Sequence, residues 1–163
     1  MQISILVATQ SGTATRVANA VRHALGAEGH TIEVLPMDDL DADVFRHDGA
    51  FLICTSTYGA GDVPINARFF LTDLRLERPN LDGTLIGIIG LGDSTFGSTF
   101  NNGGARFEDM LESLNAHIVG DRLRHDASGD IGAEEAGVAW ARAWIAEVLD
   151  LVGADDIASL TDR

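Results

Sequence analysis

Near its N-terminus the chain reads ISILVATQSGTAT over residues 3–15, and this stretch decides the fold. The first part, Ile3 to Ala8, is a largely apolar run of strand length. The polar second part opens directly into a helix-compatible stretch that ends at Gly26 and Gly29. A buried strand that feeds a helix through a short loop is typical of a βαβ unit. Residues 3–15 therefore predict a parallel sheet.

The same alternation of strand and helix continues outward along the chain. We expect further strands at 31–35, 50–55 and 84–91, and a weaker edge strand at 117–123. Helices are expected at about 67–76, 104–114 and 133–152. This pattern predicts an α/β fold, a doubly wound five-stranded parallel sheet of order 2-1-3-4-5 in three layers. We place one domain at 1–152 and a polar C-terminal tail at 153–163.

Composition and charge limit the classes of molecule that this chain is expected to bind. Among 163 residues, 45% are apolar and 22% charged, an ordinary globular balance without a run of about 20 apolar residues. The net charge is −14 and no lysine is present, which disfavours nucleic acid and anionic lipid as partners. The acidity either attracts a basic protein surface or serves solubility alone. The single cysteine, Cys54, and the lack of a signal-like N-terminus favour the cytoplasm.

The loop after the first strand offers an anion site. Residues 9–15 supply four hydroxyls, a flexible Gly12 and the free N–H groups of a helix N-terminus. The alternative is a Ser/Thr-rich helix cap that binds nothing. A P-loop is excluded because it needs a lysine, and a dinucleotide fingerprint because it needs three spaced glycines. We interpret this loop as a phosphate cradle.

Two glycine-rich loops follow the third and fourth strands. The first places Tyr58 before Gly59 and Gly61, and the second spans residues 90–104 with further aromatics. An aromatic ring can stack on a flat ligand, and glycines bring backbone groups against its edge. Each loop alone is compatible with an ordinary turn. Beside a phosphate cradle, together they favour a phosphorylated, planar ligand.

The three segments together resemble the flavodoxin family, short-chain type. They are similar to stand-alone MioC-type flavodoxins and to the FMN domains of sulfite reductase and cytochrome P450 reductase. This resemblance covers the chain up to about residue 152 and implies FMN as cofactor. The cofactor-binding residues that it implies are Thr9, Gln10, Ser11, Gly12, Thr13, Ala14, Ser56, Thr57, Tyr58, Gly59, Gly61, Leu91, Gly92, Asp93, Ser94 and Phe96.

The resemblance also implies roles for some of these residues. Tyr58 and Phe96 would flank the flavin ring, although Phe96 stands where relatives more often carry tyrosine. The Gly59 peptide would face the ring nitrogen that is protonated on reduction. Asp62, Asp93 and Asp126 would either place negative charge near the ring, lowering the potential of the last reduction step, or only cap their loops.

The function expected from these features is one-electron transfer. The chain would be a monomeric carrier between an NADPH-dependent reductase and an acceptor protein, with a basic docking surface on the partner. The alternative is an FMN-dependent oxidoreductase component that reduces a small acceptor such as a quinone. Neither a catalytic triad nor metal-ligand spacing is present. Cys54 and the pair Trp140 and Trp144 are interpreted as core residues.

Overall fold

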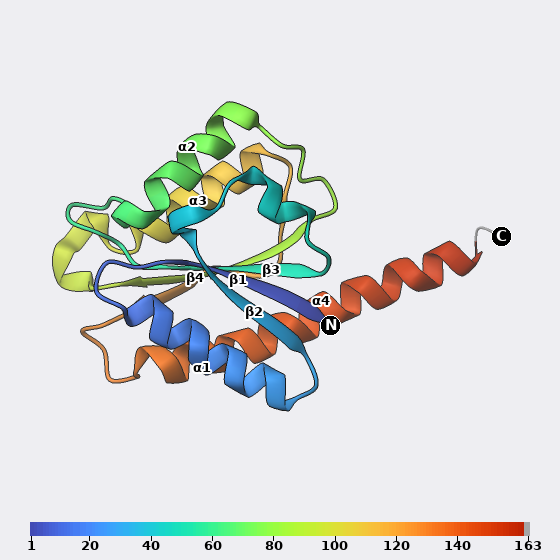
Figure 1. The fold of residues 1–163 in the computed structure, drawn as a ribbon. Helices are drawn as coiled ribbons and strands as arrows, with labels where there is room; N and C mark the ends of the chain where they lie inside the picture. The colour runs from blue at the N-terminus through green and yellow to red at the C-terminus, as the bar shows by residue number, and fades with distance from the viewer. Residues whose placement is uncertain (162–163) are drawn as a thin grey trace.

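The computed structural model describes residues 1–161, apart from the side chains at 157, 160 and 161. Its sheet has the order β2-β1-β3-β4-β5, and a sixth strand, β6, also pairs with β4. All pairings are parallel, so the predicted doubly wound order is confirmed (Figure 1). The strands are β1 (Gln2–Ala8), β2 (Thr31–Pro36), β3 (Ala50–Thr55), β4 (Leu85–Gly92), β5 (His117–Ile118) and β6 (Leu123–Asp126).

The edge of the sheet differs from the prediction of one strand at 117–123. It consists of two short strands, of which β5 pairs with the start of β4 at Leu85 and β6 with its end at Gly92. Between them Gly120 adopts a φ of +71°, a left-handed conformation that interrupts a strand. The chain then runs on to Asp126 along β4. As a result, β6 carries its last residues to the carboxyl edge of the sheet.

Helices cover both faces of the sheet. One face carries α1 (Thr13–Ala27) and α4 (Ala133–Thr161), and the other carries α2 (Arg68–Glu77) and α3 (Asn102–Ser113), as Figure 1 shows. Short 3-10 turns connect them: η1 (Met37–Asp39), η2 (Ala42–Arg46), η3 (Ile65–Ala67) and η4 (Ser94–Thr99). The three predicted layers are therefore present.

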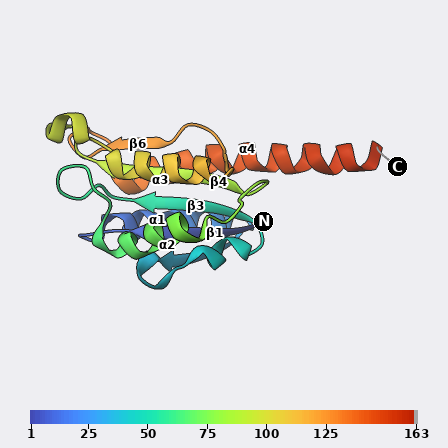
Figure 2. The same cartoon turned by 90° about the horizontal axis from the view of Figure 1, so that it is seen from above.

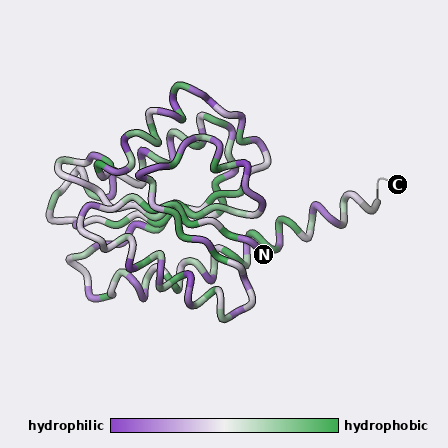
Figure 3. Tube along the Cα trace, in the orientation of Figure 1, coloured by the Kyte–Doolittle hydropathy of each residue, from purple (hydrophilic) through white to green (hydrophobic). Residues whose placement is uncertain are grey.

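Strand alternation divides the core in two. Ile3, Ile5 and Val7 of β1 join the apolar cluster under α1 and α4, whereas Leu6 and Ala8 join the cluster under α2 and α3. Hydrophobic residues therefore gather along the central strands and the inner faces of the helices (Figure 3). The stacked rings of Trp140 and Trp144, with centroids 6.1 Å apart, pack α4 on the first cluster, as expected.

The last helix is longer than predicted. The expected helix end at Val152 is wrong, because α4 continues to Thr161. The domain boundary at 152 and the polar tail at 153–163 stay predictions. Its last turns extend beyond the sheet, as Figure 2 shows from above. Gly153 costs about 1 kcal/mol in a helix interior, but the residues after it include no proline to stop the helix.

Candidate functional site

Three loops enclose one cavity at the carboxyl edge of the sheet. Because β1, β3 and β4 are parallel, their following loops leave the same edge and meet there. They line a cavity of about 320 Å³, within the range of small-molecule sites. The predicted residues that line it are Ser11, Thr13, Ser56, Thr57, Gly59, Leu91, Gly92, Asp93 and Phe96. The structure thus brings all three predicted segments together.

The other predicted residues lie in the same loops without lining the cavity. They are Thr9, Gln10, Gly12, Ala14, Tyr58, Gly61 and Ser94. Several of them shape the loops. Thr9 Oγ1 accepts a hydrogen bond from the Gly12 N–H at 2.9 Å, and the buried Ala14 carbonyl faces Cys54 Sγ at 3.4 Å. Tyr58 is 38% exposed beside the cavity.

The first turn of α1 keeps its N–H groups free. Gly12 is the N-cap with a φ of +94°, and neither a side-chain cap nor an acidic residue is present in the first turn. The first helical bond is Arg16 N–H to the Gly12 carbonyl, so the N–H groups of residues 13–15 have no carbonyl in the helix to pair with. An anion would be stabilised there by these groups and by the helix dipole. The hydroxyl-rich loop therefore does not simply cap its helix.

Arg16 adds a positive charge beside this loop, which sequence reasoning missed. Its Nη2 donates to Thr13 Oγ1 at 3.2 Å, and its Nε lies 3.3 Å from Glu134 Oε1 in the first turn of α4. A cation near a helix N-terminus is unfavourable by itself, and Glu134 compensates it. The three-residue spacing from Thr13 is the sequence signal that could have identified Arg16.

The loop after β3 is a narrow turn. Tyr58 and Asp62 exchange two backbone hydrogen bonds of 2.8 and 2.9 Å. Gly59 and Gly61 between them have φ values of +54° and +92°, which favour glycine. A Cβ at Gly61 would also lie only 3.0 Å from Thr99 Cβ. The turn therefore depends on glycine both for its backbone conformation and for its approach to η4.

The loop after β4 carries Phe96 at the rim of the cavity, where its side chain is 67% exposed. Asp93 caps this loop, since its Oδ1 accepts hydrogen bonds from Thr95 N–H at 2.9 Å and from Thr95 Oγ1 at 2.6 Å. The capping role that was one of two alternatives for Asp93 is thus present in the structure. Gly97, with a φ of +67°, then redirects the chain within η4.

Asp126 fastens the same loop from β6. Its Oδ1 accepts the Ser94 N–H at 3.0 Å and the hydroxyl of Ser128 at 2.8 Å. The hydrogen bonds from Ser94, and then those from Ser128, hold the pKa of Asp126 well below its usual range. The carboxylate therefore lies next to the predicted site, and its neighbours His125 and Ala127 line the cavity.

Sequence reasoning missed six lining residues. They are Thr99, Phe100, Asn101, His125, Ala127 and Ala133. Asn101 is the most informative, because it is fully buried with a φ of +58°. Its Nδ2 donates to the His125 carbonyl at 3.0 Å, whereas Oδ1 has no hydrogen-bond partner among the described residues. This oxygen packs against β4, where a Cβ at Gly90 would lie only 2.1 Å from it.

We searched the described residues for metal-ligand clusters, membrane-spanning helices and a reactive thiol. Residues 1–161 contain no group of three or more His, Cys, Asp or Glu side chains placed to hold a metal ion. In the same part of the chain, no helix combines the length and apolarity needed to cross a membrane. Cys54 is buried, and this burial raises the pKa of its thiol to about 12, so it is an unreactive core residue as expected.

Known proteins share both the sequence pattern and the fold. The sequence profile of the flavodoxin family matches residues 5–140. Flavodoxin YqcA of Escherichia coli is 32% identical over 146 residues, which cover 88% of this chain and 95% of that protein. A mutant flavodoxin of Pseudomonas aeruginosa superposes with a TM-score of 0.81 at 33% identity, covering 90% of this chain and 98% of that one.

A longer relative places the same domain inside a larger protein. The sulfite reductase [NADPH] flavoprotein alpha-component of Cronobacter sakazakii is 30% identical over 156 residues. The match covers 93% of this chain but only 24% of that protein. Profile, sequence relatives and fold agree, and this chain belongs to the flavodoxin family.

Proposed function

We propose that the chain binds one FMN across the three loops. The phosphate lies on residues 9–15, where the first turn of α1 and the hydroxyls of Ser11 and Thr13 face it. The flavin ring would lie between Tyr58 and Phe96, with its polar edge toward the backbone of Gly59, Gly61 and residues 91–94. The observation that carries this proposal is the single cavity that Ser11, Gly59 and Phe96 line from three separate loops.

The residues present suit this cofactor. Tyr58 and Phe96 expose aromatic rings beside the cavity, and a flat ring would cover them. A cavity of about 320 Å³ lies within the range of ligand-site sizes. The three loops supply one phosphate cradle and one site for a flat ring, as FMN requires.

Bound FMN would make the chain a one-electron carrier. The name of the sulfite reductase relative supports an NADPH-dependent reductase as the electron donor, with an acceptor protein as the second partner. The net charge of −14 supports a basic docking surface on at least one of them. We place the carrier in the cytoplasm as a monomer, and its lone buried Cys54 fits a reducing compartment.

A redox titration of the FMN-loaded protein tests this proposal. Stepwise anaerobic reduction should populate a one-electron-reduced flavin that an EPR signal detects. The reduced protein should then pass electrons to cytochrome c faster than free FMN does. Direct two-electron reduction without an EPR signal, together with turnover of a quinone by NADPH in the presence of this chain alone, would support the enzyme instead.

A further inference from the structure

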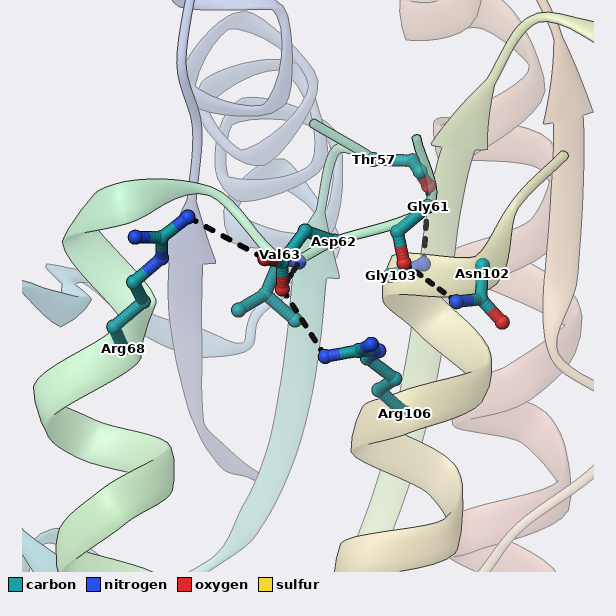
Figure 4. A network of polar contacts seen from close by, with 8 residues as sticks. All are labelled: Thr57, Gly61, Asp62, Val63, Arg68, Asn102, Gly103 and Arg106. Atoms are coloured by element: carbon teal, nitrogen blue, oxygen red, sulfur yellow. Dashed lines mark hydrogen bonds and ion pairs between the residues drawn. The ribbon is translucent and has the colours of Figure 1, made fainter. Parts of the chain in front are cut away.

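Asp62 is the centre of a network between the loop after β3 and two helices. Its Oδ1 accepts from Arg106 Nη1 of α3 at 3.1 Å and from the Val63 N–H at 2.8 Å. Its Oδ2 lies 3.3 Å from Arg68 Nη2 of α2. Figure 4 shows both guanidinium groups converging on this one carboxylate. A single side chain thus ties one loop to two separate helices.

Further contacts hold both arms of the same loop. The N–H of Gly103 donates to Thr57 Oγ1 at 3.1 Å, and Asn102 Nδ2 donates to the Gly61 carbonyl (Figure 4). The helix approaches closely here, because a Cβ on Gly103 would lie 2.5 Å from the Ser56 carbonyl oxygen. The two arms are therefore fixed to α3.

The tip of the loop is left free. Gly59 and Ala60 are exposed, and no atom lies within 4 Å of where a Gly59 Cβ would be. Gly59 nevertheless lines the cavity. Its position relative to a bound ring is consequently determined by the arms on either side of it.

The charges around Asp62 argue against a direct effect on the cavity. One carboxylate faces two guanidinium groups, so the network carries a net positive charge. Asp62 is also not among the residues that line the cavity. The proposed negative field at the ring therefore has no source in this side chain.

We propose that Asp62 is a positioning residue, which acts with Arg68 and Arg106 to hold Gly59 against the FMN ring. This inference rests on the proposed function. It differs from a charge effect in one measurable respect. Loss of the carboxylate and loss of an arginine change the local charge in opposite directions, but both release the loop.

The test compares Asp62→Asn with Arg106→Gln. Positioning predicts that both variants weaken FMN binding, by roughly two- to fivefold for an exposed ion pair, and shift the midpoint potential with the same sign. The matched control is Arg142→Gln, which breaks a pair with Glu28 of similar exposure, 55% and 42% against 54% and 42% for Arg106 and Asp62. This control should change neither quantity. Opposite shifts of potential in the two test variants would overturn the proposal in favour of a charge effect.

A second measurement uses the protein without flavin. Hydrogen exchange at the amides of Tyr58 and Asp62, which bond to each other's carbonyls, should be faster in both test variants than in Arg142→Gln. Unchanged exchange would overturn the positioning role. If the unmodified protein bound no FMN, the proposed function would fail, and this exchange experiment would still decide whether Asp62 holds the loop.

Discussion

The loops after β1 and β3 face the same cavity but are built in different ways. The first passes from β1 into α1 within four residues and presents backbone groups of the helix that it starts. The second depends on Arg68, Asn102 and Arg106, of which the last two are more than 40 residues away from their partners. In the proposed site, anion binding would therefore depend on local structure and placement of the flavin ring on tertiary contacts.

The largest effect on FMN affinity is expected from a substitution in the loop after β1. Thr13→Asp should weaken FMN binding roughly 10- to 100-fold, because it replaces the proposed hydroxyl donor to the phosphate by a negative charge. A hydrogen bond to a charged group is worth about 1.5–3 kcal/mol. Riboflavin, which lacks the phosphate, should bind as before. Fluorescence titration measures both. Thr31→Asp, at the opposite end of the sheet, is the control, and equal losses for the two ligands would contradict a phosphate site here.

A smaller loss of affinity is expected from a substitution in the loop after β3, at the proposed site of the flavin ring. Tyr58→Ala should weaken FMN and riboflavin equally, by roughly two- to tenfold, since an aromatic pair is worth about 0.5–1.5 kcal/mol beyond its burial. Tyr58→Phe keeps the ring and should retain the affinity. If titration gives an unchanged dissociation constant for Tyr58→Ala, this residue does not belong to the site.

Asp126, which holds the loop after β4, should make the stability of the protein depend on pH. Its pKa is depressed in the folded state, so its contribution to stability is present above the ordinary aspartate pKa and is lost as the pH falls through the folded value. Asp126→Asn should therefore lower the free energy of unfolding at neutral pH, with a difference that shrinks below about pH 4. Urea unfolding at several pH values measures this, and a difference independent of pH would refute it.

The smallest effect concerns docking. Electron transfer from a basic partner should slow as salt rises, because screening shortens to about 8 Å at physiological ionic strength. Asp62→Asn should flatten this salt dependence slightly, since it removes one negative charge and leaves Arg68 and Arg106 without their carboxylate partner. Stopped-flow rates over a salt series test both statements. A flat profile in the unmodified protein would mean that the acidity serves solubility alone.

The contrast between local and tertiary structure also explains which features could be predicted from the sequence. The order of the sheet and the loop at residues 9–15 could be predicted, because apolar runs and a helix start are local signals. The partners of Asp62 could not, since nothing near it in the sequence identifies Arg106. Asn101 was missed for a similar reason: its burial depends on how η4 packs over β4.

Two predictions were wrong near glycines: the edge strand at 117–123 and the end of the last helix at 152. Gly120 was not recognised as a break and divides the predicted edge strand, whereas α4 continues through Gly153 beyond its predicted end at Val152. Glycine permits both outcomes, and tertiary context decides between them. The local pattern around each residue does not contain that context.

Titration of the flavin-free protein with FMN, riboflavin and FAD tests the central claim most directly. We predict that one FMN binds per chain, at least tenfold more tightly than riboflavin, because the proposed site holds the phosphate at the first turn of α1. FAD should bind more weakly than FMN, since we expect nothing in the three loops to hold its adenine half. Equal affinity for FMN and riboflavin, or no binding of any of the three, would contradict this account.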